Sequence, residues 1–289
     1  MNEYFLGCPV WACQQWQGNL FTDAAPRTGW LRQYSGVFNT VEGNSTFYGL
    51  PELAVIKNWC QQTCEGFRFA LKFPREVTHE HQLAAGWDTL DHFINILEIL
   101  AQHGRLGPSL LQLPPFFDSS GLPRLTEFIR RWPAKFPIAV EVRHLDFFDD
   151  GTVEDELNSM LSEHSADRAL FDSRPLFSAP PSDVIEEESQ RRKPRSPHRT
   201  TAIGRYPMLR LVGRNDVASA RAWIDEWAST TAEWICEGRQ PFVFTHAPDD
   251  RFAPEMAEMF HAAMQRSIKD LADLPVWPGR QQMRQLGLF

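Results

Sequence analysis

The sequence predicts an α/β fold, a single (β/α)8 TIM barrel, and three observations support this class. Eight short apolar runs, each bounded by turn residues, are typical of strands buried on both faces. Amphipathic helical stretches separate the runs, so that strand and helix alternate along the chain. No GxGxxG follows the first run and no GxxxxGK followed by Ser or Thr occurs, which disfavours the nucleotide-binding sheets. Eight such units fit a chain of 289 residues, a length common among α/β barrels.

The expected strands share a brief, mostly apolar core and end at a turn or at a polar residue. They are residues 4–7, 37–42, 67–72, 108–113, 138–143, 168–172, 208–213 and 241–246.

The expected helices carry apolar residues at a spacing of three and four. In 51–62, Pro51 suits the first turn of a helix. In 88–104, Asp88 is the expected N-cap and Gly104 suits the left-handed position after the last turn. The remaining helical stretches are 27–35, 122–133, 152–164, 218–235 and 254–268.

We expect one barrel domain over residues 1–275, with a loop insertion at 173–207 between strands six and seven and a C-terminal tail at 276–289. The insertion is rich in Pro, Ser and Arg, and its centre fits a short helix in which glutamates face arginines at i,i+4. Two interpretations stay open for it. It is either a solvated charged loop or a lid that binds anions over the barrel mouth.

Composition limits the classes of function. The net charge of −8 argues against broad affinity for nucleic acid phosphates. No apolar run of about 20 residues predicts a membrane span, and the N-terminus lacks the basic region of a secretory signal. Five cysteines without a CxxC pair favour free thiols in a reducing compartment. We therefore expect a cytoplasmic protein.

Polar residues collect at the carboxyl ends of the expected strands, where barrels of this kind place their active sites. Charges within apolar strands are costly to bury unless they are paired, so each needs a structural or functional cause. The structural cause would be a charge network that plugs the barrel. Under the functional one, the candidate catalytic residues are Glu42, Lys72, Glu141, Asp172 and His246. The candidate substrate-binding residues are Asn44, Thr46, Tyr48, Gln112, Arg143, His144, Arg174 and Arg210.

Two kinds of carboxylate chemistry fit these residues. Glu42, Glu141, Asp172 and His246 are ligand types of a divalent metal site. Glu42 and Glu141 equally allow general acid–base catalysis without a metal, provided that their surroundings separate their pKa values.

The cations point to the substrate. Lys72, Arg143 and Arg210 suit a phosphate or a carboxylate, so we expect a small anionic ligand. A Schiff base on Lys72 is less favoured, because a lysine among carboxylates tends to stay protonated. The sequence thus predicts an enzyme, a hydrolase, lyase or isomerase, acting on an anionic substrate.

Five motifs in order resemble the DUF72 family, the YecE-like proteins. They are "VEGNSTFYGLP", "FRFALKFPREVTHE", "LLQLPPFF", "AVEVRHLDFF" and "FDSRP", and the resemblance covers nearly the whole chain. It implies a TIM-barrel fold and no known reaction.

The end of the chain suggests a partner. The peptide "QLGLF" resembles the short motif by which bacterial proteins dock on the sliding clamp of DNA replication. Its residues Gln285, Leu286, Leu288 and Phe289 would make the contacts, in a protein that works near DNA. The alternative is that the terminal pair packs on the barrel itself.

Overall fold

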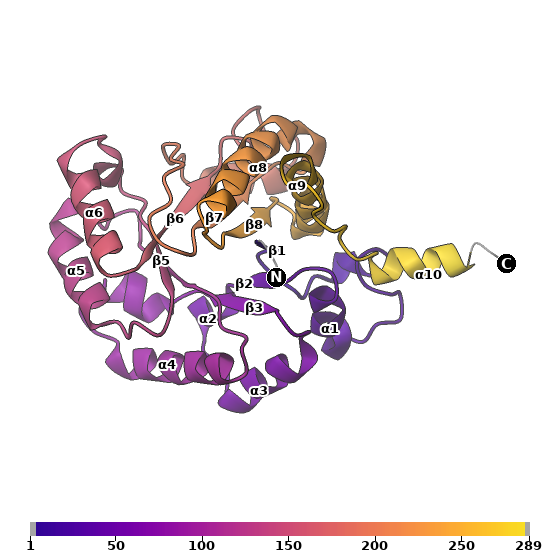
Figure 1. The fold of residues 1–289 in the computed structure, drawn as a ribbon, viewed down its shortest axis with the longest axis horizontal. Helices are drawn as coiled ribbons and strands as arrows, with labels where there is room; N and C mark the ends of the chain where they lie inside the picture. Colours follow the sequence, from indigo (N-terminus) through magenta and orange to yellow (C-terminus); the bar gives the residue numbers. More distant parts are fainter. Residues whose placement is uncertain (1–3, 287–289) are drawn as a thin grey trace.

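In a computed structural model that describes residues 4–286, eight strands alternate with helices, as the sequence predicts. Every strand pairing is parallel. The strands lie at the centre of Figure 1 with helices around them. They are β1 Phe5–Gly7, β2 Thr40–Gly43, β3 Arg68–Leu71, β4 Ser109–Gln112, β5 Ile138–Glu141, β6 Asp167–Asp172, β7 Met208–Val212 and β8 Phe242–His246.

The helices of the described residues include every one that the sequence predicts. They are α1 Trp30–Ser35, α2 Ser45–Tyr48, α3 Leu53–Gln62, α4 Trp87–Gln102, α5 Leu122–Arg131, α6 Thr152–Glu163, α7 Val184–Arg192, α8 Arg221–Cys236, α9 Ala253–Ser267 and α10 Pro278–Leu286. Gly104 follows α4 with φ of 64°, the left-handed conformation expected for it. Asp88 is not the N-cap of α4: the helix already begins at Trp87, so Asp88 lies in the first turn.

Hydrogen bonding divides the strands into a curled sheet of six, in the order β1-β8-β7-β6-β5-β4, and a pair, β2-β3. The predicted α/β fold with parallel strands is therefore confirmed, whereas the closed eight-stranded barrel is not. A few backbone hydrogen bonds bridge the two seams. At the first, Glu42 N donates to Cys8 O at 3.1 Å; at the second, Phe69 N donates to Arg105 O at 2.8 Å, Gly107 N to Phe69 O at 2.9 Å and Phe73 N to Leu110 O at 3.0 Å. At the first seam a side chain on Gly7 would come within 2.0 Å of Thr40 O, so only glycine fits there.

The inner faces of the strands form two layers with different chemistry. A buried apolar cluster comprises Phe5, Ala70, Leu110, Ala139, Ala169, Met208, Phe242 and Phe244. Residues two apart in a strand share a face, so the next inward positions lie toward the carboxyl ends. These positions hold Lys72, Gln112, Glu141, Phe171, Arg210 and His246. An apolar floor thus supports a polar layer at the end of the strands where activity is expected.

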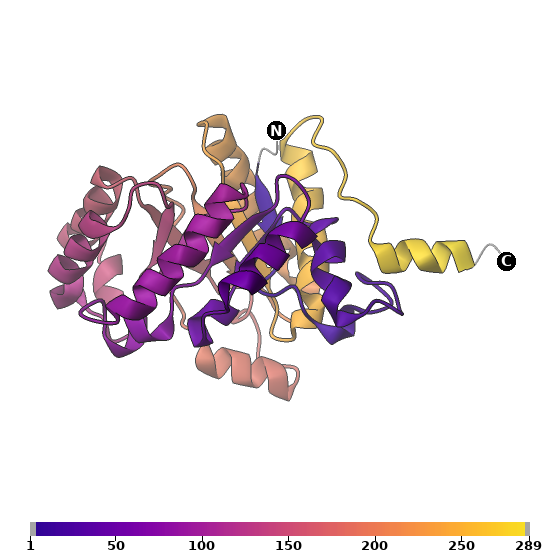
Figure 2. The same cartoon turned by 90° about the horizontal axis from the view of Figure 1, so that it is seen from below.

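Two helices, α7 and α10, lie apart from the helices that surround the strands. The centre of 173–207 forms α7, as predicted, and Glu188 pairs with Arg192 one turn later. Figure 2 shows α7, in salmon, apart from the other helices at the lower end of the molecule. The second is α10, which the sequence did not predict; it extends sideways from the body in Figures 1 and 2.

The first residues of α10 are tied to the body. Trp277 is buried just before the helix, and the guanidinium of Arg280 lies 3.6 Å from the centroid of its ring. Arg280 also pairs with Glu258 of α9 at 2.8 Å.

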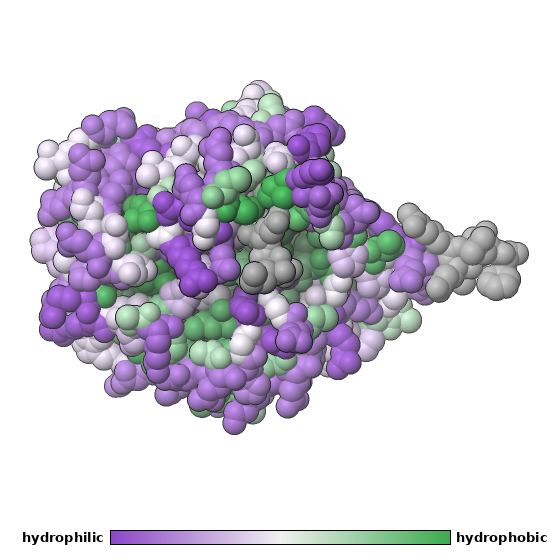
Figure 3. Space-filling view, in the orientation of Figure 1, coloured by the Kyte–Doolittle hydropathy of each residue, from purple (hydrophilic) through white to green (hydrophobic). Residues whose placement is uncertain are grey.

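Hydrophilic side chains form the rim of the face in Figure 3, and hydrophobic ones gather toward its centre. Over the described part of the chain, no helix has the length and apolar character that crossing a membrane requires.

Candidate active site at the carboxyl ends of the strands

The centre of the polar layer is Arg210, whose guanidinium lies buried between two carboxylates. Its Nε and Nη2 donate to Oε2 and Oε1 of Glu42 at 2.7 and 2.8 Å. Its Nη1 donates to Oε2 of Glu141 at 2.5 Å. All three side chains are nearly inaccessible to solvent. Such a buried group is tolerated only when geometry and hydrogen bonding compensate for the lost hydration.

Neighbouring strands complete that compensation, because every oxygen of the two carboxylates accepts at least one hydrogen bond. Gln112 Nε2 and Arg143 Nε donate to Glu141 Oε1 at 2.6 and 2.8 Å. Asn44 Nδ2 donates to Glu42 Oε1 at 2.7 Å. His246 Nε2 lies 3.3 Å from Glu42 Oε2.

The network holds both carboxylates ionised. Burial would raise the pKa of Glu42, but Arg210 and His246 outweigh it and keep the pKa well below its usual range. Burial likewise opposes ionisation of Glu141, yet Arg210 and Arg143 lower its pKa to about 2. Burial lowers the pKa of His246 to about 4, so its imidazole is neutral at pH 7. Neither glutamate is poised to give up a proton near neutral pH.

Lys72 follows β3 in the same layer and is only 9% exposed. Its Nζ lies 4.0 Å from the centroid of the Phe47 ring, and among residues 4–286 it has no hydrogen-bond acceptor or ion-pair partner. Thr46 Oγ1 donates to the Lys72 carbonyl at 2.6 Å, which fixes the backbone. Burial, followed by the charge of Arg210, lowers the pKa of Lys72 to about 7.

A pocket of about 430 Å³ opens above this layer. Strand-end residues form its floor and walls: Asn44, Tyr48, Lys72, Gln112, Arg143, Arg210 and His246. The segment 173–207 forms its roof, because Ile185, Glu188, Ser189, Arg192 and Lys193 line the same space. Burial, followed by Arg210, lowers the pKa of Lys193 to about 8. Of the two interpretations of this segment, its position matches the lid.

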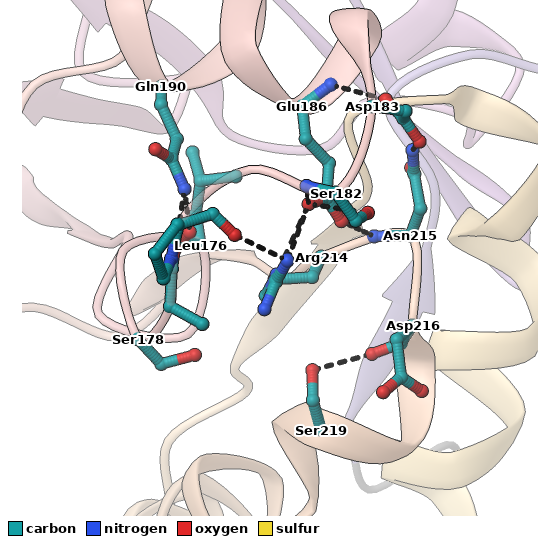
Figure 4. A network of polar contacts seen from close by, with 12 residues as sticks. Leu176, Ser178, Ser182, Asp183, Glu186, Gln190, Arg214, Asn215, Asp216 and Ser219 are labelled. Atoms are coloured by element: carbon teal, nitrogen blue, oxygen red, sulfur yellow. Dashed lines mark hydrogen bonds and ion pairs between the residues drawn. The ribbon is translucent and has the colours of Figure 1, made fainter.

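The roof is anchored to the loop after β7, as Figure 4 shows. Glu186 of α7 accepts hydrogen bonds from Ser182 N at 2.9 Å, Arg214 Nη2 at 2.7 Å and Asn215 N at 2.8 Å. Asp183 caps the helix by accepting from the amides of residues 185 and 186. These contacts fix α7 above the pocket.

Two predicted site residues, Asp172 and Arg174, do not line the pocket. Asp172 accepts from Trp227 Nε1 of α8 at 2.7 Å and pairs with Arg174 at 2.7 Å, on the outer face of β6. Asp172 points outward because successive side chains in a strand point to opposite faces of the sheet. Phe171 takes the inward position, 5.5 and 5.4 Å from the guanidiniums of Arg143 and Arg210.

Three other predicted residues take supporting or marginal places. His144 accepts from Asp146 N at 3.3 Å, capping a short helical turn, and does not line the pocket. Thr46 is buried beneath it, where it holds Lys72. Tyr48 stands at the rim with 82% of its surface exposed.

The proposed metal ligands do not form a metal site. Asp172 points away from the pocket, and the oxygens of Glu42 and Glu141 are occupied by guanidinium and amide donors. Within residues 4–286, no cluster of three or more His, Cys, Asp or Glu could hold a metal ion.

Sequence reasoning missed Lys193, Phe47 and Phe171. Lys193 lies in the segment 173–207, for which the sequence allows both a solvated loop and a lid. No nearby residue distinguishes it from the other basic residues of that segment. Phe47 and Phe171 are apolar, so a search restricted to polar strand ends passes over them. The two-residue alternation would have found Phe171.

The clamp-docking hypothesis stays a prediction. Gln285 and Leu286 belong to the last turn of α10, and Leu288 and Phe289 lie outside the described residues.

Comparisons with known proteins agree with the fold. The family described as "Protein of unknown function DUF72" matches residues 5–282. The UPF0759 protein YecE of Escherichia coli K12 is 32% identical over 279 residues, which cover 96% of this chain and 99% of the relative. A DUF72 family protein from Enterococcus faecalis V583 superposes with a TM-score of 0.67 at 16% identity, covering 93% of this chain and 97% of that one. One from Thermotoga maritima MSB8 gives 0.65 at 22% identity, covering 91% and 99%.

Proposed function

Since the chain belongs to the DUF72 family of proteins of unknown function, we propose a function from its pocket: an enzyme that binds a small phosphate- or carboxylate-bearing substrate. In this proposal the eight strands act as one barrel, and the substrate lies between their carboxyl ends and α7.

The observation that carries the proposal is a surplus of positive charge. Arg210 and Arg143 balance Glu42 and Glu141 within the buried network. Lys72 and Lys193 line the pocket as well, and neither forms an ion pair within the described part of the chain. Glu188 and Arg192 of the roof pair with each other, so Asp250, whose pKa is raised by burial, is the lining carboxylate set against the two lysines. An anion between them would supply the missing counter-charge.

The same two lysines are the best candidates for proton transfer. Their pKa values of about 7 and about 8 lie near neutral pH, where a general acid or base works most efficiently. The carboxylates, held ionised by Arg210, instead fix the charge and shape of the floor. This assignment favours acid–base chemistry by lysine over the glutamate pair and over metal assistance.

Anion titration tests the proposal. Inorganic phosphate and oxalate should bind the wild-type protein in calorimetry, and Lys193→Ala should weaken binding roughly tenfold, or about 1.4 kcal/mol. Lys57→Ala, which removes an exposed lysine from α3 outside the pocket, is the matched control. Equal affinities in all three proteins, or no binding at all, would contradict an anion site at this pocket.

A second candidate function is docking on the bacterial sliding clamp. The observation that favours it is that α10 extends away from the body and carries the start of the "QLGLF" peptide at its end. A labelled peptide of the last ten residues should bind purified clamp saturably, with a micromolar Kd corresponding to about −8 kcal/mol. Alanine at Leu288 and Phe289 should abolish the binding. If the full chain loses thermal stability when the tail is deleted and the peptide does not bind, the tail is structural.

A further inference from the structure

We propose that Lys72 is a nucleophile that forms an imine with an aldehyde or ketone bearing a phosphate or a carboxylate. This inference rests on the proposed function, which supplies the anion-binding pocket, and adds the class of substrate and the bond that forms.

The position of the side chain is the first argument. Lys72 lies at the carboxyl end of a central strand, lines the pocket and is almost fully buried. Its Nζ packs on the face of Phe47, and no carboxylate or carbonyl of the described residues accepts a hydrogen bond from it. A lysine kept for structure would be expected to pair with one of the two nearby glutamates. Here Arg210 occupies both of them.

The second argument is the balance of charge around the amine. The ionisable groups that face it come from β2, β5, β7 and the turn after β3, and they are Glu42, Glu141, Arg143, Arg210 and His79. The glutamates are neutralised by the arginines, and burial lowers the pKa of His79 to about 4, so that it is uncharged at pH 7. Desolvation near fixed cations is how proteins keep a lysine neutral and reactive.

The degree of activation follows from the pKa of Lys72, about 7. About half of the Lys72 side chains are then neutral at pH 7. An ordinary lysine, with a pKa of about 10.4, is neutral in roughly one molecule in 2,500. The expectation that carboxylates would keep Lys72 protonated fails because those carboxylates are paired elsewhere.

The step balances with groups in the pocket. The lone pair of Nζ attacks the carbonyl carbon, the nitrogen gives up one proton and the carbonyl oxygen takes one up, which gives a neutral carbinolamine. A second proton converts the hydroxyl to leaving water as the nitrogen lone pair forms the C=N bond, and the resulting iminium then releases its N–H proton to give the imine. Lys193 lines the same pocket with a pKa of about 8, so it can carry these protons. The net change is one amine and one carbonyl giving one imine and one water.

Reductive trapping tests the inference. The full-length protein is incubated with glycolaldehyde phosphate or glyoxylate and sodium cyanoborohydride, which reduces an imine to a stable secondary amine. Each attachment adds the mass of the probe less one oxygen, and peptide mapping locates it. We expect the adduct at Lys72, roughly a hundredfold faster than at the exposed Lys57, Lys135 and Lys269. The trapping rate should rise as pH increases through about 7 and then level off.

Further controls sharpen the result. Uncharged glycolaldehyde should label Lys72 less than its phosphate does, and inorganic phosphate should compete with both anionic probes. Lys72→Arg keeps the charge without a nucleophile and should lose the adduct, and Lys72→Met, which keeps the contact with Phe47, replaces it if the arginine variant does not fold. Lys135→Arg should leave labelling of Lys72 unchanged.

The outcomes separate the two proposals. If phosphate binds the pocket and weakens with Lys193→Ala, but adducts spread over the surface lysines or fall on Lys193, the imine is wrong and the anion site stands. If Lys72 is labelled equally by glycolaldehyde and its phosphate, without competition, the nucleophile stands and anion recognition is wrong. Absence of both binding and labelling overturns both.

Discussion

Asp167 shows what burial costs a carboxylate that forms no ion pair within the described residues. It lies at the start of β6, far along the strand from the pocket, and is 1% exposed. Tyr206 N donates to its Oδ2 at 3.1 Å, but its Oδ1 has no hydrogen-bond partner among the described residues. Burial therefore dominates, and it raises the pKa of Asp167 to about 6. Glu141, equally buried, has two guanidiniums and a lowered pKa.

We predict that Asp167→Asn stabilises the protein at pH 7. The raised pKa means that the folded state holds its proton to higher pH than the unfolded chain, so stability falls as pH rises from about 4 to about 6 and stays lower above. Asparagine carries no charge and can still accept from Tyr206 N. Removing the penalty should add about 1 to 3 kcal/mol to the free energy of unfolding at pH 7.

Urea unfolding at pH 7 and pH 4 measures this, since the gain should shrink at the lower pH. Asp88→Asn, on the exposed face of the first turn of α4, is the control and should change little. A less stable Asp167→Asn at pH 7 would count against the charge penalty.

At the scale of elements, the sequence is most informative where local periodicity decides the structure. Apolar runs and stripes predict the eight strands and the helices that cover them, because each element must bury one face. Local periodicity does not predict helix α10, since Arg280 holds it through contacts with Glu258 and Asn19, which are distant in the sequence. The sequence does not predict the division into two sheets either, because strand register is set by packing between distant parts of the chain.

Some residues of the candidate site can likewise be predicted from the sequence, and others cannot. Strand ends alone suffice to bring Glu42, Lys72, Glu141 and Arg210 together, since parallel strands end at one edge. Asp172 also lies at a strand end, but its side chain points to the outer face of β6, because successive side chains in a strand alternate between the two faces. The sequence does not place Lys193, because the loop insertion 173–207, 35 residues long, can lie anywhere around the carboxyl ends of the strands.

At the scale of the whole molecule, Arg210 joins the two sheets. Glu42 belongs to the β2-β3 pair, while Glu141 and Arg210 itself belong to the six-stranded sheet. Backbone hydrogen bonds across the seams are few, so this ion triad is a main polar connection between the two halves. It lies buried where its charges cannot be replaced by water.

We predict that Arg210→Met destabilises the protein by about 3 to 5 kcal/mol at pH 7, because it leaves two buried carboxylates without their partner. Chemical denaturation measures the loss. Adding Glu42→Gln and Glu141→Gln to the same variant should restore most of it, since no buried charge then lacks a counter-charge. A single variant as stable as wild type, or a triple variant no better than the single, would show that the triad does not hold the sheets together.

The roof and the floor of the pocket are encoded in separate stretches of the chain, and this separation has an evolutionary consequence. Strand residues of the floor also hold the two sheets together, so their replacement is constrained by stability. The segment 173–207 is held to the body through Glu186 and its partners in the loop after β7, and through Arg199, which pairs with Glu154 of α6. Substitutions at Ile185, Ser189 or Lys193 can therefore change which molecules enter while the scaffold persists, so that lineages sharing this fold are free to diverge in what they recognise.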